Sequence, residues 1–165
     1  MLARLRVLGL FISVCLASGH AASTNVTVSF VDPATFTDAD DTTNGLRPLL
    51  EIEAHLQRLG ERYLPPRTTV RIDVLDVQLA GSVHLSSTGW KARYMTGDAD
   101  WPRILVRYTV ETGGRASLPV EETIVDRSYL RRVDREYPYA VALPHEKRML
   151  NEWFKARFAG APPMH

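Results

Sequence analysis

Cysteine is almost absent from this chain, since Cys15 is the only one among 165 residues. Because Cys15 lies near the start, the remainder of the chain has no disulfide, no thiol nucleophile and no thiolate metal ligand. Lysine is nearly as scarce: only Lys91, Lys147 and Lys155 occur among 20 basic residues, and the others are arginine, an excess typical of codon bias. The formal net charge of +1 excludes the strong positive field that attracts nucleic acids.

Long apolar runs are also missing. The longest one covers residues 7–17, which is too short to span a bilayer, because a transmembrane helix needs about 20 apolar residues. Arginines precede this run and small residues follow it. This order predicts a secretory signal peptide over residues 1–22, cleaved after Ala21 or Ala22. We therefore expect an exported protein, with no transmembrane segment after removal of the signal.

Apolar patterning divides residues 23–160 into a single domain of mixed structure. Apolar residues recur three and four apart over residues 48–64 and 144–158, which predicts two amphipathic helices. Alternating or continuous apolar patterns predict strands over residues 26–31, 68–79, 104–111 and 118–125. The predicted fold class is α+β, with both helices on one face of a mainly antiparallel sheet of about four strands. Residues 161–165 are expected to form a disordered tail.

Two stretches carry weaker patterns. Residues 80–101 are polar and rich in glycine, which predicts a long loop with a short strand near residues 92–95. Residues 126–139 are charged and aromatic, and we interpret them as a short helix followed by a loop. In the second strand the apolar phase reverses between Val74 and Leu75. This reversal predicts either a β-bulge or a strand that is buried on both faces.

No complete catalytic or metal-binding motif is present. His145 and Glu146 begin the zinc-protease pattern HExxH, but Met149 occupies the position of the second histidine. We interpret the pair as an exposed first helical turn. The acidic stretches 38–44 and 98–100 lack the residues that an EF-hand loop requires. We interpret both as solvated loops whose carboxylates cap threonine and backbone donors, and a weak calcium contact is the alternative. The serine elbow G-x-S-x-G is absent as well, and we predict no metal or other cofactor.

Asp76 is unusual because it is an acidic residue within an apolar strand. We interpret it as a carboxylate bound by backbone N–H groups or by an arginine, and Arg103 is the candidate partner. Asp73, three residues earlier, is expected to point to the opposite face unless a bulge realigns the two side chains. A hydrolase with an acidic site around Asp38, Asp40, Asp73 and Asp76 stays open as an alternative.

Arginines gather in the charged stretch before the second helix. On a helix, Arg127, Arg131 and Arg135 would form one stripe. Interleaved acidic residues would compensate their charge, namely Asp126, Asp134 and Glu136. This pattern favours a salt-bridged, solvated surface. A patch that binds an anion or a partner is the alternative.

Two short motifs bound the polar stretch of residues 80–101: Leu79-Ala80-Gly81 before it and Trp101-Pro102-Arg103 after it. If the strands on either side are neighbours, both motifs meet at one end of the sheet, where loops tend to carry binding residues. The candidate binding residues are therefore Asp76, Gly81, Trp101, Arg103 and Arg131. Alternatively, the ring of Trp101 closes the end of the hydrophobic core.

Several motifs occur in a recognisable order. They are Val28-x-Phe30, Phe36-Thr37-Asp38, Asp76-x-x-Leu79-Ala80-Gly81, Trp101-Pro102-Arg103-Ile104, Asp126-x-x-Tyr129 and Lys147-x-x-Leu150-x-x-Trp153-Phe154. In this order the chain resembles domain-of-unknown-function family 3016, a set of small exported bacterial proteins, over roughly residues 26–158. The resemblance implies a periplasmic location in a Gram-negative envelope, without glycosylation at Asn25. It implies no activity.

Together these observations favour a non-catalytic periplasmic binding or accessory module. Its expected partner is an envelope protein or a small ligand, and not nucleic acid. Two alternatives are the hydrolase described above and a structural subunit of an envelope complex. A pocket converging on carboxylates or histidine would favour an enzyme, whereas an exposed apolar patch rimmed by arginine would favour binding.

Overall fold

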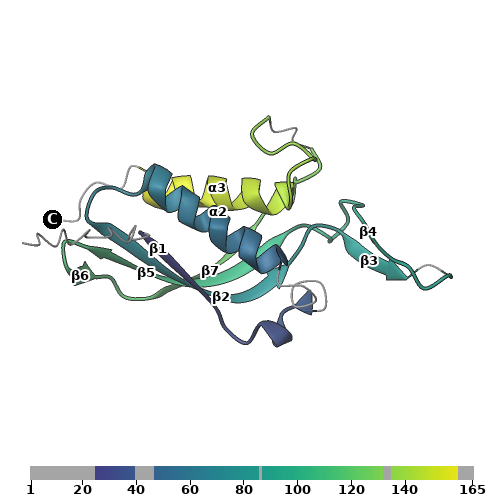
Figure 1. The fold of residues 1–165 in the computed structure, drawn as a ribbon, viewed down its shortest axis with the longest axis horizontal. Helices are drawn as coiled ribbons and strands as arrows, with labels where there is room; N and C mark the ends of the chain where they lie inside the picture. Colours follow the sequence, from purple (N-terminus) through teal and green to yellow (C-terminus); the bar gives the residue numbers. More distant parts are fainter. Residues whose placement is uncertain (1–24, 40–46, 86, 132–134, 160–165) are drawn as a thin grey trace, which may run out of the picture.

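The computed structural model of the protein describes residues 25–39, 47–85, 87–131 and 135–159. The predicted signal peptide, Asp40 and the predicted tail lie outside these ranges. Within them the chain has an α+β fold, in which two helices lie on one face of a mixed, mainly antiparallel sheet (Figure 1). The predicted fold class is confirmed.

The main sheet consists of β1 (Val26–Phe30), β2 (Thr68–Gln78), β5 (Arg103–Thr112), β6 (Arg115–Ala116) and β7 (Val120–Val125). β1 pairs in parallel with β2, β2 pairs antiparallel with β5, and β5 pairs antiparallel with both β6 and β7. β1 and β7 are therefore outer strands. The sequence predicts every strand of this main sheet except β6, which extends the turn at Gly113 and Gly114.

A β-bulge interrupts β2. Its register with β5 shifts between Val74 and Asp76, which leaves Leu75 without an opposite residue. Val74 before the shift and Val77 after it are both buried, so the bulge reverses the alternation and confirms one of the two predicted causes. Because of this reversal, Asp73 and Asp76 point to the same, helix-free face of the sheet, as the sequence analysis allowed if a bulge occurred.

Helices α2 (Arg47–Tyr63) and α3 (Pro144–Phe158) bury their apolar faces against the sheet. α2 contacts β1, and α3 contacts β7. Trp153 and Phe154 are 7% and 0% exposed, as expected for core residues. Gly60 lies where α2 approaches Val26, and an added Cβ would collide with that valine side chain. Close packing therefore explains a residue that weakens a helix by about 1 kcal/mol.

Residues 80–101 form a second sheet, where the sequence predicted a loop. β3 (Ser82–Leu85) pairs antiparallel with β4 (Lys91–Tyr94), and this hairpin projects from one end of the main sheet (Figure 1). We term the described residues of the hairpin, 82–85 and 87–94, the arm. The predicted short strand corresponds to β4. The loop prediction was wrong because neither face of the arm is buried in a core, so no apolar alternation marks its strands.

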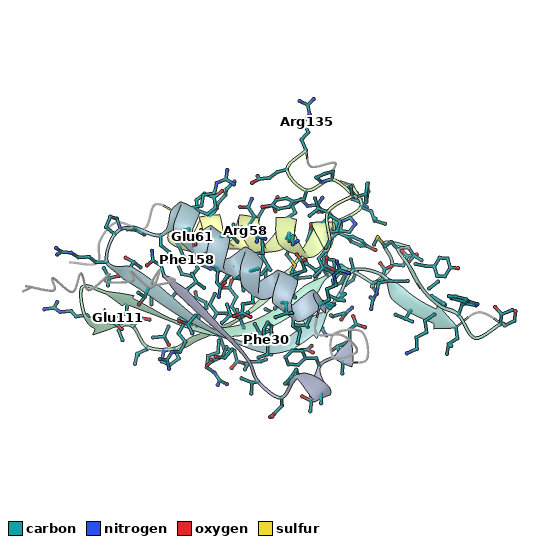
Figure 2. The ribbon with its side chains drawn as sticks, in the orientation of Figure 1. Phe30, Arg58, Glu61, Glu111, Arg135 and Phe158 are labelled. Carbon is teal, nitrogen blue, oxygen red and sulfur yellow. The ribbon has the colours of Figure 1, made fainter. Side chains whose placement is uncertain are left out.

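The helix predicted within residues 126–139 is absent from its described parts, which form turns (126–131 and 135–139). Tyr129 explains the difference, since its side chain is fully buried and its carbonyl accepts a hydrogen bond from Arg148 of α3. The arginine stripe therefore does not form. Arg135 stands clear of the molecule at the outermost turn (Figure 2).

Candidate functional site

The two motifs that bound the arm meet at its base. The Gly81 N–H donates a hydrogen bond to the Asp100 carbonyl at 2.8 Å, and the strands β2 and β5 on either side are paired. The geometric part of the prediction is thus confirmed. We term the junction of residues 79–81 with residues 96–101 the root. Gly81 has a φ of +84°, and a Cβ there would lie 2.5 Å from the Tyr94 carbonyl oxygen, so the turn requires glycine.

Charged side chains bind the backbone of the root. Asp38 Oδ2 accepts the Leu79 N–H at 2.7 Å, and Glu146 Oε1 accepts the Ala80 N–H at 2.7 Å. Arg93 of β4 donates a hydrogen bond to the Gly81 carbonyl at 2.6 Å. Its Nη2 also lies 3.3 Å from Asp38 Oδ1. A single arginine thus connects the arm, the root and the segment after β1.

The first turn of α3 is buried, with His145 at 3% and Glu146 at 2% exposure. The predicted exposed turn was wrong because the turns preceding α3 fold over it. Burial raises the pKa of the Glu146 carboxyl, although the Ala80 N–H opposes the rise. Burial lowers the pKa of His145, whose ring meets the Tyr129 ring edge-on with centroids 4.9 Å apart. In both groups burial thus disfavours the charged form.

Asp100 is buried at 3% exposure, so the prediction of a solvated loop was wrong here, whereas the predicted capping of threonine and backbone donors is confirmed. Its carboxylate accepts the Tyr129 hydroxyl at 2.8 Å, the Thr96 N–H at 2.7 Å and the Gly97 N–H at 2.9 Å. Burial alone would raise the pKa of Asp100, but these hydrogen bonds outweigh it and lower the pKa. Burial and the neighbouring carboxylate raise the pKa of Tyr129 to about 12, which keeps its hydroxyl a donor.

A buried ion pair fixes the same tyrosine from its backbone side. Arg148 Nη2 lies 2.8 Å from Asp126 Oδ2 and donates to the Tyr129 carbonyl at 2.7 Å. Burial would raise the pKa of Asp126, but the hydrogen bonds from Arg148 and Ser128 and the charge of Arg148 together outweigh it and lower the pKa. Asp126 therefore pairs with α3, and Glu136 pairs with Arg62 of α2. The compensation predicted for Asp126 is therefore wrong, and Asp134 lies outside the described residues.

The root network is the set of side chains that these contacts join: Asp38, Arg93, Asp100, Asp126, Tyr129, Glu146 and Arg148. Its carboxylates accept hydrogen bonds from within the chain, an arrangement suited to positioning backbone. Sequence reasoning missed Tyr129 and Arg148 as members. Among the residues that the structure describes, no three His, Cys, Asp or Glu side chains are grouped to hold a metal ion.

Asp76 and Arg103 lie beside the root on the helix-free face. Asp76 Oδ2 is 3.7 Å from an Arg103 guanidinium nitrogen, and the carboxylate also accepts the Thr37 N–H at 2.6 Å. The predicted pairing is confirmed. Binding by these two residues stays a prediction.

Trp101 is half-buried, with the Arg127 guanidinium 5.5 Å from its ring centroid. It is therefore neither fully enclosed in the core nor free of contacts. Arg131 is exposed at the end of a turn, where its N–H donates to the Ser128 carbonyl at 2.9 Å. The binding roles of Trp101 and Arg131 also stay predictions.

The arm carries large apolar side chains that the sequence analysis did not single out. Leu85, Trp90 and Tyr94 are 71%, 77% and 58% exposed, and the outer part of the arm projects beyond the molecular body (Figure 2). The His84 and Tyr94 rings meet edge-on at 5.6 Å on one face of the hairpin. The available signal was Trp90 itself, a large aromatic residue within a polar stretch that offers it no core.

Fold and contacts define an α+β domain with a projecting hairpin fixed by a buried polar network. A family described as a protein of unknown function (DUF3016) matches residues 24–156, and the chain belongs to this family, which confirms the resemblance. No curated protein and no solved structure matches the chain. In the part of the chain that the structure describes, the helices are too short or too polar to cross a membrane.

Proposed function

We propose that this chain is an exported, non-catalytic binding module of the cell envelope, and that its arm contacts another envelope protein. The observation that carries the proposal is the exposure of Leu85, Trp90 and Tyr94 on a projecting hairpin. Trp and Tyr are enriched among the residues that dominate binding energy at protein interfaces. Leu85 and Tyr94 lie on opposite faces of the hairpin, so both of its faces offer exposed apolar side chains for such a contact.

The root supports this proposal by giving the arm a fixed base. An isolated two-stranded hairpin is only marginally stable in water. Arg93 and the hydrogen bond of Gly81 tie both strands of this hairpin to the body. A binding surface that is ordered before contact loses less conformational entropy on association. The buried charges of the root thus serve the exposed surface of the arm.

A protein partner suits the arm better than a small ligand, which normally binds in a concave site. Hollows of about 590, 350 and 320 Å³ occur among the described residues, and no arm residue lines these three. The hydrolase alternative has less support, because Asp38 and Asp76 both accept backbone hydrogen bonds and Asp40 lies outside the described residues. A structural subunit would use the same arm but remain bound stoichiometrically.

Site-specific photo-crosslinking in intact cells tests the proposal. A photoreactive residue replaces Leu85 or Trp90, and the matched control replaces Leu50, an apolar residue of α2 that is 58% exposed. We expect a discrete adduct with one envelope protein from the arm positions only. The same adduct should weaken when Tyr94→Ser is combined with the probe at position 85. Equal labelling from position 50, or no adduct from the arm, would overturn the proposal.

A further inference from the structure

The outer edge of β7 is an unpaired strand edge at the opposite side of the sheet from β1. The Asp126 N–H donates to the Pro102 carbonyl of the segment leading into β5 at 3.3 Å. Because backbone groups of successive residues point to opposite sides of a strand, those of Ile124 also point to β5. The N–H and C=O groups of Glu121, Thr123 and Val125 therefore point away from the sheet. Among the described strands, only β5 pairs with β7.

This edge lacks the usual protection against pairing. Natural edge strands are blunted by charge, above all lysine, by internal proline or by a bulge. β7, VEETIV, has no lysine, proline or bulge, and its two glutamates are already paired with Arg107 and Arg157 of the same chain. Leu118, Val120 and Val125 are 85%, 44% and 39% exposed along it. A hollow of about 590 Å³ lies between β7 and α3, lined by Met149 and Ala156 among others. An added strand would cover these exposed apolar side chains and fill the hollow between β7 and α3.

We propose that a second copy of this chain pairs antiparallel with β7 through its own β7, about a twofold axis at Thr123. This register places Thr123 opposite Thr123 and Glu121 opposite Val125 of the second copy. Glu121 then lies diagonal to Arg127 of the second copy, on the same face and within reach of a long side chain. The twofold repeats this opposite-charge pair, so the edge is complementary to itself.

Charge also selects this register over its neighbours. An axis at Glu122 would place the two copies of that carboxylate directly opposite each other, and an axis at Ile124 would place Glu122 opposite Asp126 of the second copy. Like charges directly opposite destabilise a strand pair. The Thr123 axis avoids both conflicts and gives a closed, isologous dimer instead of an open fibre. The dimer would display two arms, which raises avidity for a partner that has two sites.

The oligomeric state of the purified protein tests the proposal, by sedimentation velocity from about 1 to about 100 µM. We expect a dimer. Thr123→Pro removes only an outward N–H and should raise the dimer dissociation constant about tenfold or more. The matched control Thr123→Val retains the N–H and should stay dimeric. A monomeric wild-type protein, or a Thr123→Pro variant that dimerises as tightly as the wild type, would overturn the proposal.

Two further variants place the contact independently of proline. In a Cys15→Ser background, Thr123→Cys should form an intermolecular disulfide on mild oxidation, because opposed Cα atoms in a hydrogen-bonded pair are about 5.5 Å apart. Ser29→Cys, on the other outer strand, is the control. Glu121→Arg and Arg127→Glu should each weaken the dimer, and the double variant should restore it. A disulfide at position 29 instead of 123 would refute pairing through β7.

Discussion

The root and the arm adjoin each other, yet they distribute polarity in opposite ways. In the root network, Glu146, Asp100 and Arg148 are at most 4% exposed. In the arm, Leu85 and Trp90 are more than two thirds exposed. The hairpin has no core of its own, so buried hydrogen bonds fix its base while its apolar side chains remain available for contact. Side chains that stabilise this protein and those proposed to bind its partner are therefore separate sets.

Loss of the buried ion pair should give the largest effect on stability. Arg148→Ala leaves the Asp126 carboxylate buried without its partner, which should lower the free energy of unfolding by about 3–5 kcal/mol. Arg62→Ala, which breaks the exposed pair with Glu136, is the control and should cost far less, because solvent screens an exposed ion pair. Urea denaturation measures both. Equal losses would mean that the root network does not stabilise the fold.

Two glycines, one directly before β3 and one in the turn between β3 and β4, sharpen the same contrast. Gly81 in the root and Gly89 in the arm have φ values of +84° and +81°, but a Cβ would collide with Tyr94 only at Gly81. Gly89→Ala should cost about 1 kcal/mol from backbone strain alone. Gly81→Ala should cost about 3 kcal/mol, because steric displacement adds to this strain. Thermal unfolding of both variants checks the ranking, and a cost at Gly89 as large as that at Gly81 would contradict it.

The buried interior should also respond to pH through His55 of α2. Its Nε2 lies 2.9 Å from the Lys147 carbonyl oxygen, and burial lowers its pKa to about 4 from 6.5. Between these values the unfolded chain binds a proton that the folded chain does not. The contribution of neutral His55 to the free energy of unfolding is therefore fully present above about pH 6.5. It is lost as the pH falls toward about 4.

His55→Gln removes this titration. From about pH 7 to about pH 5, wild-type protein should lose about 2 kcal/mol more unfolding free energy than the variant. Urea titrations at the two pH values give the difference. Parallel pH profiles for wild type and variant would show that His55 does not titrate in this way.

Substitutions in the arm should have the smallest effect on stability. Leu85 and Trp90 bury little surface, so Leu85→Ser combined with Trp90→Ser should change the free energy of unfolding by no more than about 0.5 kcal/mol. Trp153→Ala, which empties a site in the core, is the contrasting variant and should cost about 3–5 kcal/mol. A loss of several kcal/mol from the double arm variant would assign these side chains to the core.

The helices and main strands could be predicted from the sequence because each buries one face at a regular period. The apolar stripe that includes Trp153 identified α3, and the phase reversal after Val74 identified the bulge. The pairing of Asp76 with Arg103 followed from an acidic residue on one strand and a basic residue on the next. Local patterns thus sufficed wherever one face of an element is buried.

The root and the arm could not be predicted because their determinants are not local. Asp100, Tyr129 and Glu146 come from separate segments, and only the fold brings them together. Their charge and polarity alone favour exposure, which is why the turn at Glu146 was placed in solvent. The strands of the arm could not be predicted for a different reason: a hairpin without a buried face shows no apolar alternation in its sequence.

The most direct test of the separation between root and arm combines stability with partner capture in one variant. Leu85→Ser/Trp90→Ser is compared with Leu50→Ser, using the envelope protein identified by photo-crosslinking at the arm, and both variants are checked by urea denaturation. We predict that the arm variant unfolds like the wild type yet captures less than about a tenth of the partner, a loss of about 1.4 kcal/mol or more in binding. Leu50→Ser should capture it normally. Undiminished capture by the stably folded arm variant would contradict the account.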